Sequence, residues 1–412
     1  MNTQTLKGFR DFLPAEKLRR NWVQQKIVAA FELSGFLPLE TPTLEYKEVI
    51  MGKYGEEADK LVYEFVDNGG REVALRYDQT VPLSRVVAEN RFNIALPFRR
   101  YQIQNVFRAD KPQKGRYREF TQCDIDIVGS ASPLADAEIL ATTYQAFVNL
   151  GFTEVELRVN DRQVLLSTLS PFATDEVSVL QIIQSIDKLD KMTPADVSAE
   201  LVDKGLSKES ADAALEAVKQ AQKSKNLAEI FSIAESLGVP AKALVFSPAI
   251  ARGLDYYTGM IFEIVAPSFS SGSLGGGGRY DNLLNDLGGV DLPAVGVGLG
   301  FDRIVEAVDS LNLIVEDDIL GAGVLVTVFA EEQQSISAAV TQQFRQAGIS
   351  TELFNSTEKL AKQFKYANKL SIPWVVVVGP EEAEKGMVQL KNMTSGEQVT
   401  VSVDEAIATV QK

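Results

Sequence analysis

Two segments of alternating aromatic and β-branched residues constrain the fold of this chain more than any other feature. They cover residues 96–110 and 118–129, and alternation with a period of two is typical of β-strands. The residues between them, 111–117, include Pro112 and Gly115, which favour a break in the pattern. We therefore predict two antiparallel strands joined by a short loop.

The pattern changes to helical spacing in the middle of the chain. Apolar residues recur at helical intervals from Val179 to Leu189, and the residues up to 236 are rich in Ala, Lys and Glu. This predicts a helical insertion over 172–245. Strand patterns return at 261–267, and residues 292–308 have the pattern of a strand that runs into a helix.

The last hundred residues alternate between strand and helix patterns. Their β-α-β-α-β order predicts a small three-layer domain with a mixed sheet. The fold class predicted for the whole chain is α+β, with a core on an antiparallel sheet, a helical insertion and a C-terminal α/β domain. The predicted division places two parts of the core around the insertion: 1–171 and 246–318 for the core, 172–245 for the insertion and 319–412 for the C-terminal domain.

Composition narrows the chemistry. The 412 residues include no histidine and a single cysteine, Cys123, which excludes imidazole catalysis, a disulfide framework and a site with several cysteine ligands. The formal charge of −15 argues against non-specific binding of nucleic acid by the whole surface, although a local basic patch can still hold RNA. No segment has the length and apolarity of a signal peptide or a membrane span, so we expect a cytoplasmic protein.

Three arginines lie where side chains can face a pocket. Arg108 ends a predicted strand, and Arg252 and Arg303 lie beside glycines and aromatic residues. The planar guanidinium binds phosphate and carboxylate oxygens and stays charged at any working pH. Three converging arginines would neutralise a triphosphate and the charge that develops at phosphorus. A surface ion pair explains any one of them equally well.

Carboxylates and glycines form further candidate sites. Residues 122, 124 and 126 share one face of a strand, so that Gln122, Asp124 and Asp126 would line one pocket or one solvated sheet face. The glycine cluster at 271–281 allows close approach of a ligand or forms a flexible hairpin loop. It matches no phosphate-binding glycine motif.

A row of lysines follows one arc of a C-terminal helix. The side chains of Lys359, Lys362, Lys365 and Lys369 would all lie on that arc. A basic helix face can bind RNA phosphates, but most such faces are simply solvated.

Taken together, these segments resemble the class II aminoacyl-tRNA synthetases, and specifically the histidyl-tRNA synthetase family, from about residue 5 to the end. Five segments carry the resemblance in the order expected of the family: 41–45 with Pro42, LRYDQT at 75–80, 107–129, ARGLDYYTG at 251–259 and GVGLGFDRI at 296–304. The resemblance implies a class II synthetase core, an anticodon-binding domain at 319–412 and a homodimer formed through the Pro42 segment.

The resemblance also implies roles for the arginines. Arg108 would hold the α-phosphate of ATP and the amino-acid carboxylate, and Arg252 would stabilise the same developing charge. Arg303 would contact the γ-phosphate, and Arg116 would hold ATP or the tRNA acceptor end. The nucleotide would enter with Mg²⁺, and no protein metal site is expected.

A second set of residues is implied to bind histidine. Asp78, Thr80 and Gln122 would hold the α-amino group, Asp126 and Tyr257 would recognise the two imidazole nitrogens, and Tyr256 and Tyr280 would line the pocket. Since the imidazole presents a donor and an acceptor when neutral, such a pair would reject other amino acids. The implied partners are L-histidine, ATP and tRNA(His), with no membrane.

The rival function is regulatory. Proteins similar to histidyl-tRNA synthetase also serve as non-catalytic regulators of ATP phosphoribosyltransferase. Such proteins typically lack the C-terminal domain and lose catalytic residues, whereas here both the domain pattern and Arg108, Arg252 and Arg303 are present. The sequence therefore favours the enzyme.

Overall fold

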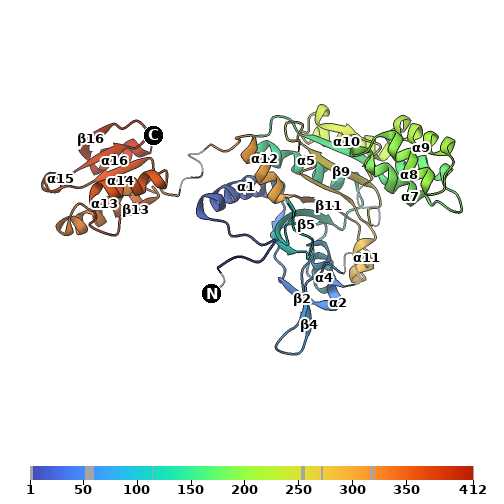
Figure 1. Ribbon diagram of the computed structural model, residues 1–412, viewed down its shortest axis with the longest axis horizontal. Helices are drawn as coiled ribbons and strands as arrows, with labels where there is room; N and C mark the ends of the chain where they lie inside the picture. Colours follow the sequence, from blue (N-terminus) through green and yellow to red (C-terminus); the bar gives the residue numbers. More distant parts are fainter. Residues whose placement is uncertain are drawn as a thin grey trace. The chain divides into compact units, whose positions relative to one another are not determined.

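The computed structural model describes residues 3–51, 60–113, 115–251, 256–270, 272–315, 319 and 321–411 (Figure 1). The chain divides into two compact units. One comprises residues 1–11 and 23–313, and the other comprises residues 12–22 and 314–412.

An eight-stranded sheet, counted over the described residues, forms the centre of the first unit. Its strand order is β1-β5-β6-β11-β10-β9-β7-β8. The β1–β5 and β7–β8 pairs are parallel and the others are antiparallel. The bounds are β1 Leu37–Pro38, β5 Phe98–Phe107, β6 Glu119–Val128, β7 Glu156–Asp161, β8 Leu244–Phe246, β9 Met260–Val265, β10 Gly275–Arg279 and β11 Ala294–Leu299.

The antiparallel strand pair predicted on either side of the basic loop is confirmed by β5 and β6. Their register places Arg100 opposite Asp126, Gln102 opposite Asp124 and Gln104 opposite Gln122. The even-numbered residues of both strands therefore share one face of the sheet. The intervening residues of β6, Cys123, Ile125 and Ile127, are buried on the other face.

The helices cover both faces of this sheet. On the face of the odd-numbered β6 residues, α5 (Pro133–Asn149) packs against β6 and β11, and α12 (Phe301–Ser310) packs against β6. On the even-numbered face, Leu83 of α4 (Thr80–Asn90) and Leu284 of α11 (Leu283–Gly288) form a core cluster with Val128. The space between this cluster and the basic loop is left to polar residues, which we describe below.

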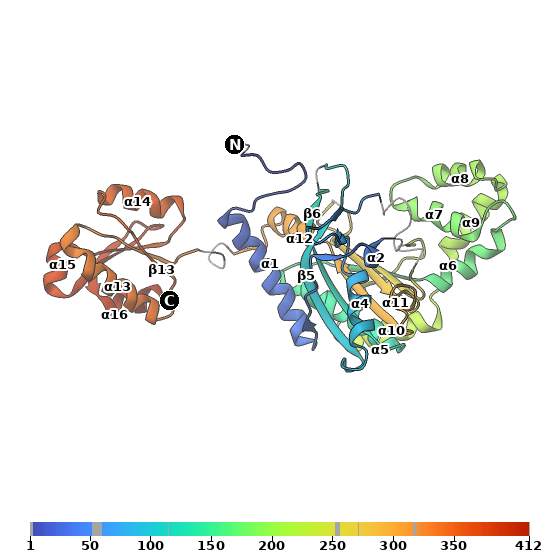
Figure 2. The same ribbon diagram turned by 90° about the horizontal axis from the view of Figure 1, so that it is seen from below.

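A group of helices follows β7. These are α6 (Arg162–Leu169), α7 (Val179–Ile186), α8 (Pro194–Asp203) and α9 (Lys208–Gln220), and α7, α8 and α9 lie together in both views (Figures 1 and 2). Their apolar faces form one core with fully buried Ile182, Ile183 and Leu201. The next helix, α10 (Lys225–Ser236), packs instead on α5. The proposed limits of the insertion, 172 and 245, remain a prediction.

A second, small sheet has the order β2-β4-β3 (Leu44–Tyr46, Glu72–Leu75 and Glu64–Val66). Its inward face carries Ala74, which joins a core cluster with Ile50 of α2 (Lys47–Ile50) and Val81 of α4. Glu45 lies opposite Ala74 and is also buried.

The second unit contains a mixed five-stranded sheet in its described part, ordered β13-β12-β14-β15-β16. Val324 and Val326 of β12 pack toward α13 and α16, whereas Leu325 between them packs toward α14. The predicted three-layer arrangement is therefore confirmed (Figure 2). Its elements are β12 Val324–Val326, α13 Gln334–Gln346, β13 Thr351–Leu353, α14 Leu360–Lys369, β14 Trp374–Val377, α15 Pro380–Lys385, β15 Met387–Asn392, β16 Gln398–Ser402 and α16 Val403–Val410.

The structure corrects the interpretation of the glycine cluster. Residues 275–279 are not a flexible hairpin loop but strand β10, paired on both sides with β9 and β11, and Gly276 of this strand lines the cavity described below. Glycine weakens an isolated strand because it contributes no side chain and loses much backbone entropy. Here hydrogen-bonded neighbours on both sides fix the backbone as a strand.

Candidate active site

A polar cavity of about 160 Å³ opens over β6, β11 and β10 in the first unit. It brings together eight of the residues predicted to bind substrate: Asp78, Thr80, Arg108, Gln122, Asp126, Tyr256, Tyr257 and Tyr280. These residues come from four separate segments of the chain, 75–80, 107–129, 251–259 and 271–281. Their convergence shows that Arg108 and the predicted carboxylates belong to one pocket.

Glycines form the floor of the cavity. Gly276, Gly296 and Gly298 line it, and Gly276 lies opposite Gly298 across the β10–β11 pair. A Cβ at Gly296 would lie 2.0 Å from Oδ1 of Asp126 and 2.7 Å from the backbone oxygen of Ile125. The missing side chain is therefore what allows Asp126 to lean over the neighbouring strand.

Asp126 is held from two sides. An ion pair of 2.7 Å joins its Oδ2 to Nη2 of Arg100, and the hydroxyl of Tyr280 donates a hydrogen bond to its Oδ1. Burial raises the pKa of Asp126, while Arg100 and the Tyr280 hydrogen bond act to lower it. Burial, together with the nearby Asp126 charge, also raises the pKa of Tyr280 well above its usual value, so its phenol stays a hydrogen-bond donor.

Asp124 is a second buried carboxyl in the same cavity. Gln122 donates a hydrogen bond from Nε2 to Oδ2 of Asp124 over 2.7 Å. Burial raises the pKa of Asp124 to about 7, with Arg100 opposing the shift. The two carboxyls therefore differ in their environments, because the side chain of Asp126 is ion-paired with Arg100 and that of Asp124 is hydrogen-bonded to a neutral amide.

Arg108 enters the cavity from the end of β5. Its Nε donates to the backbone oxygen of Tyr77 over 3.1 Å, and its guanidinium lies 4.4 Å from the centre of the Tyr77 ring and 5.2 Å from that of Phe120. Aromatic faces favour a guanidinium through cation–π attraction. The side chain is thus oriented while part of its donor fork stays available for an anion.

The turn before α4 positions Asp78 and Thr80. Oδ1 of Asp78 accepts a hydrogen bond from the backbone N–H of Val81 over 3.1 Å, which satisfies a free donor in the first turn of the helix. Gln79, which lies between Asp78 and Thr80 in the chain, is fully buried. Its Nε2 donates to the backbone oxygens of Gln104 and Gln122, over 3.1 Å each. The side-chain amide of Gln79 therefore attaches the turn to β5 and β6 beside the cavity that Gln122 lines.

The other predicted arginines are not brought into the cavity lining. Arg303, in the first turn of α12, donates from Nη1 to the backbone oxygen of Ser273 over 2.7 Å. Arg116 is exposed on the basic loop, with Nη1 3.8 Å from Oδ1 of Asp110. Arg252 lies outside the described residues. The phosphate contacts expected of these three side chains remain predictions.

One supporting residue near the basic loop was not predicted. Arg10 pairs with Asp302 over 2.7 Å, and its guanidinium lies 3.3 Å from the centre of the Tyr117 ring. Asp302 precedes Arg303 and Tyr117 follows Arg116 in the chain. Arg10 therefore connects the two segments that carry the predicted phosphate-binding arginines.

A second unpredicted residue, Arg279, supports the tyrosines of the cavity. Its Nε donates to both carboxylate oxygens of buried Asp136, 3.1 Å each. The backbone oxygen of Arg279 accepts from the N–H of Thr258 over 2.7 Å. Tyr257 and Tyr280, the sequence neighbours of these two residues, are thereby held together. The sequence signal for Arg279 is a charged residue that directly follows four glycines, a position that suits a buried ion pair.

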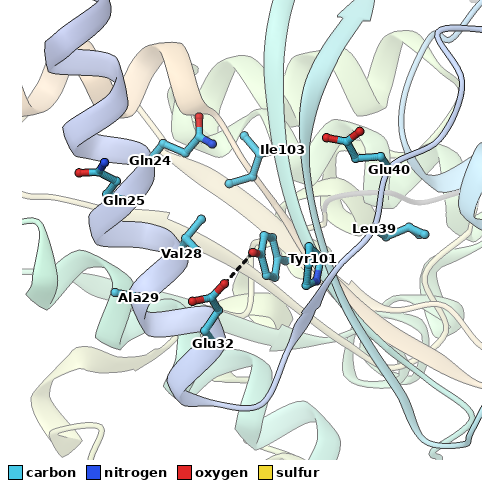
Figure 3. Close-up of a pocket in the computed structure, with 10 residues that line it drawn as sticks. Gln24, Gln25, Val28, Ala29, Glu32, Leu39, Glu40, Tyr101 and Ile103 are labelled. Atoms are coloured by element: carbon cyan, nitrogen blue, oxygen red, sulfur yellow. Dashed lines mark hydrogen bonds between the residues drawn. The ribbon is translucent and has the colours of Figure 1, made fainter.

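A larger groove of about 450 Å³ lies on the opposite face of β5 (Figure 3). Tyr101 and Ile103 of β5 face Gln24, Val28 and Glu32 of α1 (Pro14–Leu33) there. The Tyr101 hydroxyl donates to Oε1 of Glu32 over 2.9 Å, and burial together with this bond raises the pKa of Tyr101 to about 12. No predicted substrate-binding residue lines this groove.

The described residues contain neither a membrane-spanning helix nor a cluster of metal ligands. None of their helices is long and apolar enough to cross a membrane. Within the same residues, no group of three or more acidic or cysteine side chains is arranged to hold a metal ion.

Comparisons with known proteins agree over nearly the whole chain. The sequence model described as "Histidyl-tRNA synthetase" matches residues 8–304, and that described as "Anticodon binding domain" matches residues 323–412. The histidine–tRNA ligases of Cytophaga hutchinsonii and Bacteroides fragilis are each 37% identical. The alignments cover 97% and 98% of this chain and 98% of each relative. The crystal structure of histidyl-tRNA synthetase from Nostoc sp. PCC 7120 is 30% identical, with a TM-score of 0.89, over 100% of this chain and 99% of that one.

Proposed function

The chain belongs to the histidyl-tRNA synthetase family, and from that premise we propose that the polar cavity over β6, β11 and β10 is where histidine is activated. The reaction is the ATP-dependent formation of histidyl-adenylate from L-histidine, followed by transfer of the histidyl group to the 3′ end of tRNA(His). In the first step a carboxylate oxygen attacks the α-phosphorus and pyrophosphate leaves. In the second a ribose hydroxyl of the tRNA attacks the acyl carbon and AMP leaves.

The observation that carries the assignment is the match between the cavity and the three polar groups of histidine. Arg108, with its guanidinium oriented between aromatic rings, suits the carboxylate and the adjoining α-phosphate. Asp78, Thr80 and Gln122 supply acceptors and a negative charge for the α-ammonium group. Asp126 and Tyr257 suit the two imidazole nitrogens, and Tyr256 and Tyr280 enclose the ring.

The phosphates of ATP are assigned to arginines. Arg303 would meet the γ-phosphate, Arg116 the nucleotide or the acceptor end, and Arg252 the α-phosphate beside Arg108. Neutralising the charge that builds on the phosphoryl oxygens lowers the barrier to displacement. Mg²⁺ would arrive with the nucleotide as part of the substrate complex and would offset part of its phosphate charge.

The tRNA is assigned to two surfaces. The exposed basic loop around Arg116 would meet the acceptor end. The lysine face of α14, with Lys362 and Lys365 among its members, would meet the anticodon region, since the second unit matches the anticodon-binding model. A cytoplasmic location belongs to the same proposal, because both ATP and tRNA are used there.

A homodimer is supported by the outward face of the small sheet. Leu44, Tyr46 and Phe65 are 43%, 54% and 48% exposed, whereas Glu45 between the first two is buried. Leu44 and Tyr46 of β2 lie opposite Leu75 and Val73 of β4, so the apolar face continues from one strand to the next. In a strand whose outer face is exposed to solvent, polar side chains point outward and apolar side chains point inward. Here the apolar side chains point outward and the carboxylate of Glu45 is buried, which fits a surface covered by a second copy of the chain.

The experiment that tests the function is amino-acid-dependent exchange of pyrophosphate into ATP, with the twenty amino acids supplied singly. We expect exchange with histidine alone. Folded protein with Mg²⁺ that shows no exchange with any amino acid would favour the regulatory alternative. Binding to ATP phosphoribosyltransferase would then be the next measurement.

A further inference from the structure

Arg100 is a charged side chain that the assignments above leave without a role. It has no exposed surface and does not line the cavity, yet it pairs with Asp126, which does. Burial of a guanidinium is costly unless it is compensated, because the charge must be removed from water. Its position behind a single cavity carboxylate indicates a function exerted through that carboxylate.

We propose that Arg100 is a positioning residue for substrate recognition: it neutralises Asp126 beneath the bound side chain, so that the site accepts histidine with a neutral imidazole ring. The inference rests on the proposed function, since it takes the imidazole to meet Asp126. It concerns the protonation state of the substrate that is selected, which the family assignment does not specify.

The charged and titratable groups around Asp126 come from several elements. They are Arg100 on β5, Asp124 on β6, Tyr280 after β10, Tyr257 before β9, and Asp78 and Arg108 at the mouth of the cavity. Two of these are further carboxyls. Arg108 is assigned to the substrate carboxylate, so Arg100 is the described cation that remains to compensate the acidic cluster.

The consequence for the ring follows from its hydrogen bonds. A neutral imidazole offers one N–H donor and one acceptor nitrogen, whereas an imidazolium offers two donors and a positive charge. An Asp126 already paired with a cation gains little from a second positive charge, and it still accepts one N–H. Without Arg100, the carboxyl cluster would instead favour the imidazolium form.

Arg100 is itself fixed by a ladder of amides along the same face of β5. Its Nη1 donates to Oε1 of Gln102 over 3.3 Å, and Nε2 of Gln102 donates to Oγ1 of Thr41 over 2.9 Å and to Oε1 of Gln104 over 2.6 Å. Tyr101 and Ile103 face the other way, into the groove of Figure 3. The side chains on one face of β5 therefore hold the Arg100 guanidinium behind Asp126.

The test measures kcat and KM for histidine in pyrophosphate exchange from pH 6 to 8.5. The variants are Arg100→Met, which removes the charge, and Arg100→Lys, which keeps it. Arg99→Met is the matched control, because Arg99 is the adjacent residue on β5 and forms an ion pair with Glu138 at the surface. Circular dichroism and thermal unfolding report whether each variant is folded.

For the wild type and the control we expect KM to fall as pH rises through the imidazole pKa of about 6.5 and then to level off. For Arg100→Met we expect a KM at least about 30-fold higher at pH 8, a smaller change in kcat, and a KM that rises with pH. Arg100→Lys should keep the wild-type direction with an intermediate KM. A pH profile of Arg100→Met parallel to the wild type would mean a merely structural role and overturn the proposal.

A second measurement decides the matter even if Arg100→Met does not fold. Histidine labelled with ¹⁵N in the ring is bound to wild-type protein at pH 7.5, and its ring nitrogens are observed by NMR. Since the chain contains no histidine of its own, every imidazole signal belongs to the substrate. We expect two distinct nitrogens, one protonated and one not. Two protonated nitrogens would overturn the proposal.

The two proposals can fail separately. A wild-type protein without histidine-dependent exchange overturns both of them. Normal exchange in the wild type, combined with a bound imidazolium or a parallel pH profile, overturns only the role of Arg100.

Discussion

Arg100 and Asp126 face each other across the β5–β6 pair, and their side chains form a 2.7 Å ion pair in which Arg100 is wholly buried. The pair shows how the sheet serves the site. Backbone register brings the two residues together, a missing side chain at Gly296 makes room for the carboxylate, and Tyr280 holds its other oxygen. The position of Asp126 in this cavity therefore depends on residues in three neighbouring strands.

The glycine floor gives the first prediction. Gly296→Ala should raise KM for histidine at least about 30-fold, because the new Cβ meets both Asp126 and an immovable backbone oxygen. Gly298→Ala is the matched control, since its Cβ would lie 3.2 Å from Oδ1 of Asp124, a side-chain end that can shift. Steady-state exchange and thermal unfolding measure both. Equal effects of the two substitutions would contradict this account of the floor.

Removal of the oriented arginine should abolish activation. We expect Arg108→Ala to lower kcat/KM for pyrophosphate exchange by about 10³-fold or more, because the charge that develops at the α-phosphorus loses its nearest described cation. The melting temperature should change little. Arg158→Ala, which breaks a surface pair with Glu156, should behave as the wild type. An active Arg108→Ala protein would remove Arg108 from the mechanism.

Asp124 should make the unliganded protein lose stability as pH rises. Its folded-state pKa of about 7 lies above the ordinary 3.8, so the folded protein retains a proton that the unfolded chain releases. The stability this proton provides is present below pH 3.8 and is lost as pH rises to about 7. Asp124→Asn removes this loss, so its free energy of unfolding relative to the wild type should increase by about 2 to 3 kcal/mol between pH 5 and 8.

Denaturant unfolding at several pH values measures this difference. The substitution to asparagine keeps an oxygen that can accept from Gln122, so packing is preserved. Glu229→Gln, an exposed change on α10, should follow the wild type at every pH. A difference for Asp124→Asn that does not vary with pH would show that Asp124 does not titrate in this range.

The apolar face of the small sheet predicts the oligomeric state. Light scattering should give twice the chain mass of 45.1 kDa for the wild type. Tyr46→Asp should give the single-chain mass at micromolar concentration, because a charge would be buried in the interface. Glu72→Gln, an exposed change at the start of the central strand β4, should leave the dimer intact. A wild-type monomer, or an unchanged Tyr46→Asp dimer, would contradict the proposed interface.

Much of the fold was predictable because its signals are local. The strands at 98–107 and 119–128 carry period-two alternation, and the strand-to-helix pattern at 292–308 corresponds to β11 and α12. Strand β16 was missed because Gln398–Ser402 is polar and largely exposed, with its first three residues open to solvent. Such an edge strand is defined by its pairing with β15 rather than by its own residues.

Two residues that line the cavity, Arg108 and Asp126, could be singled out from the sequence because each side chain carries its own chemistry. Tyr257 was expected only from the family resemblance, and the binding roles of all three remain predictions. Arg100 was missed because a charged residue in a strand indicates solvent, and only the register with β6 shows that its partner is buried. Strand β10 was misassigned for the same reason: what keeps Gly275–Arg279 extended lies in β9 and β11. Pairwise register is set by long-range contacts, and periodicity within one segment does not contain it.

The glycine floor also limits how this pocket could be redesigned for another amino acid. Pockets are usually enlarged by trimming a side chain, but Gly276, Gly296 and Gly298 have nothing left to trim. Extra room for a bulkier, synthetic amino acid would have to come from the tyrosines that line the pocket, Tyr256, Tyr257 and Tyr280. A substitution at Tyr280 would remove the hydrogen bond that its hydroxyl donates to Asp126. Tyr257 is assigned to the imidazole, so substitutions at Tyr256 are the practical starting point for a library.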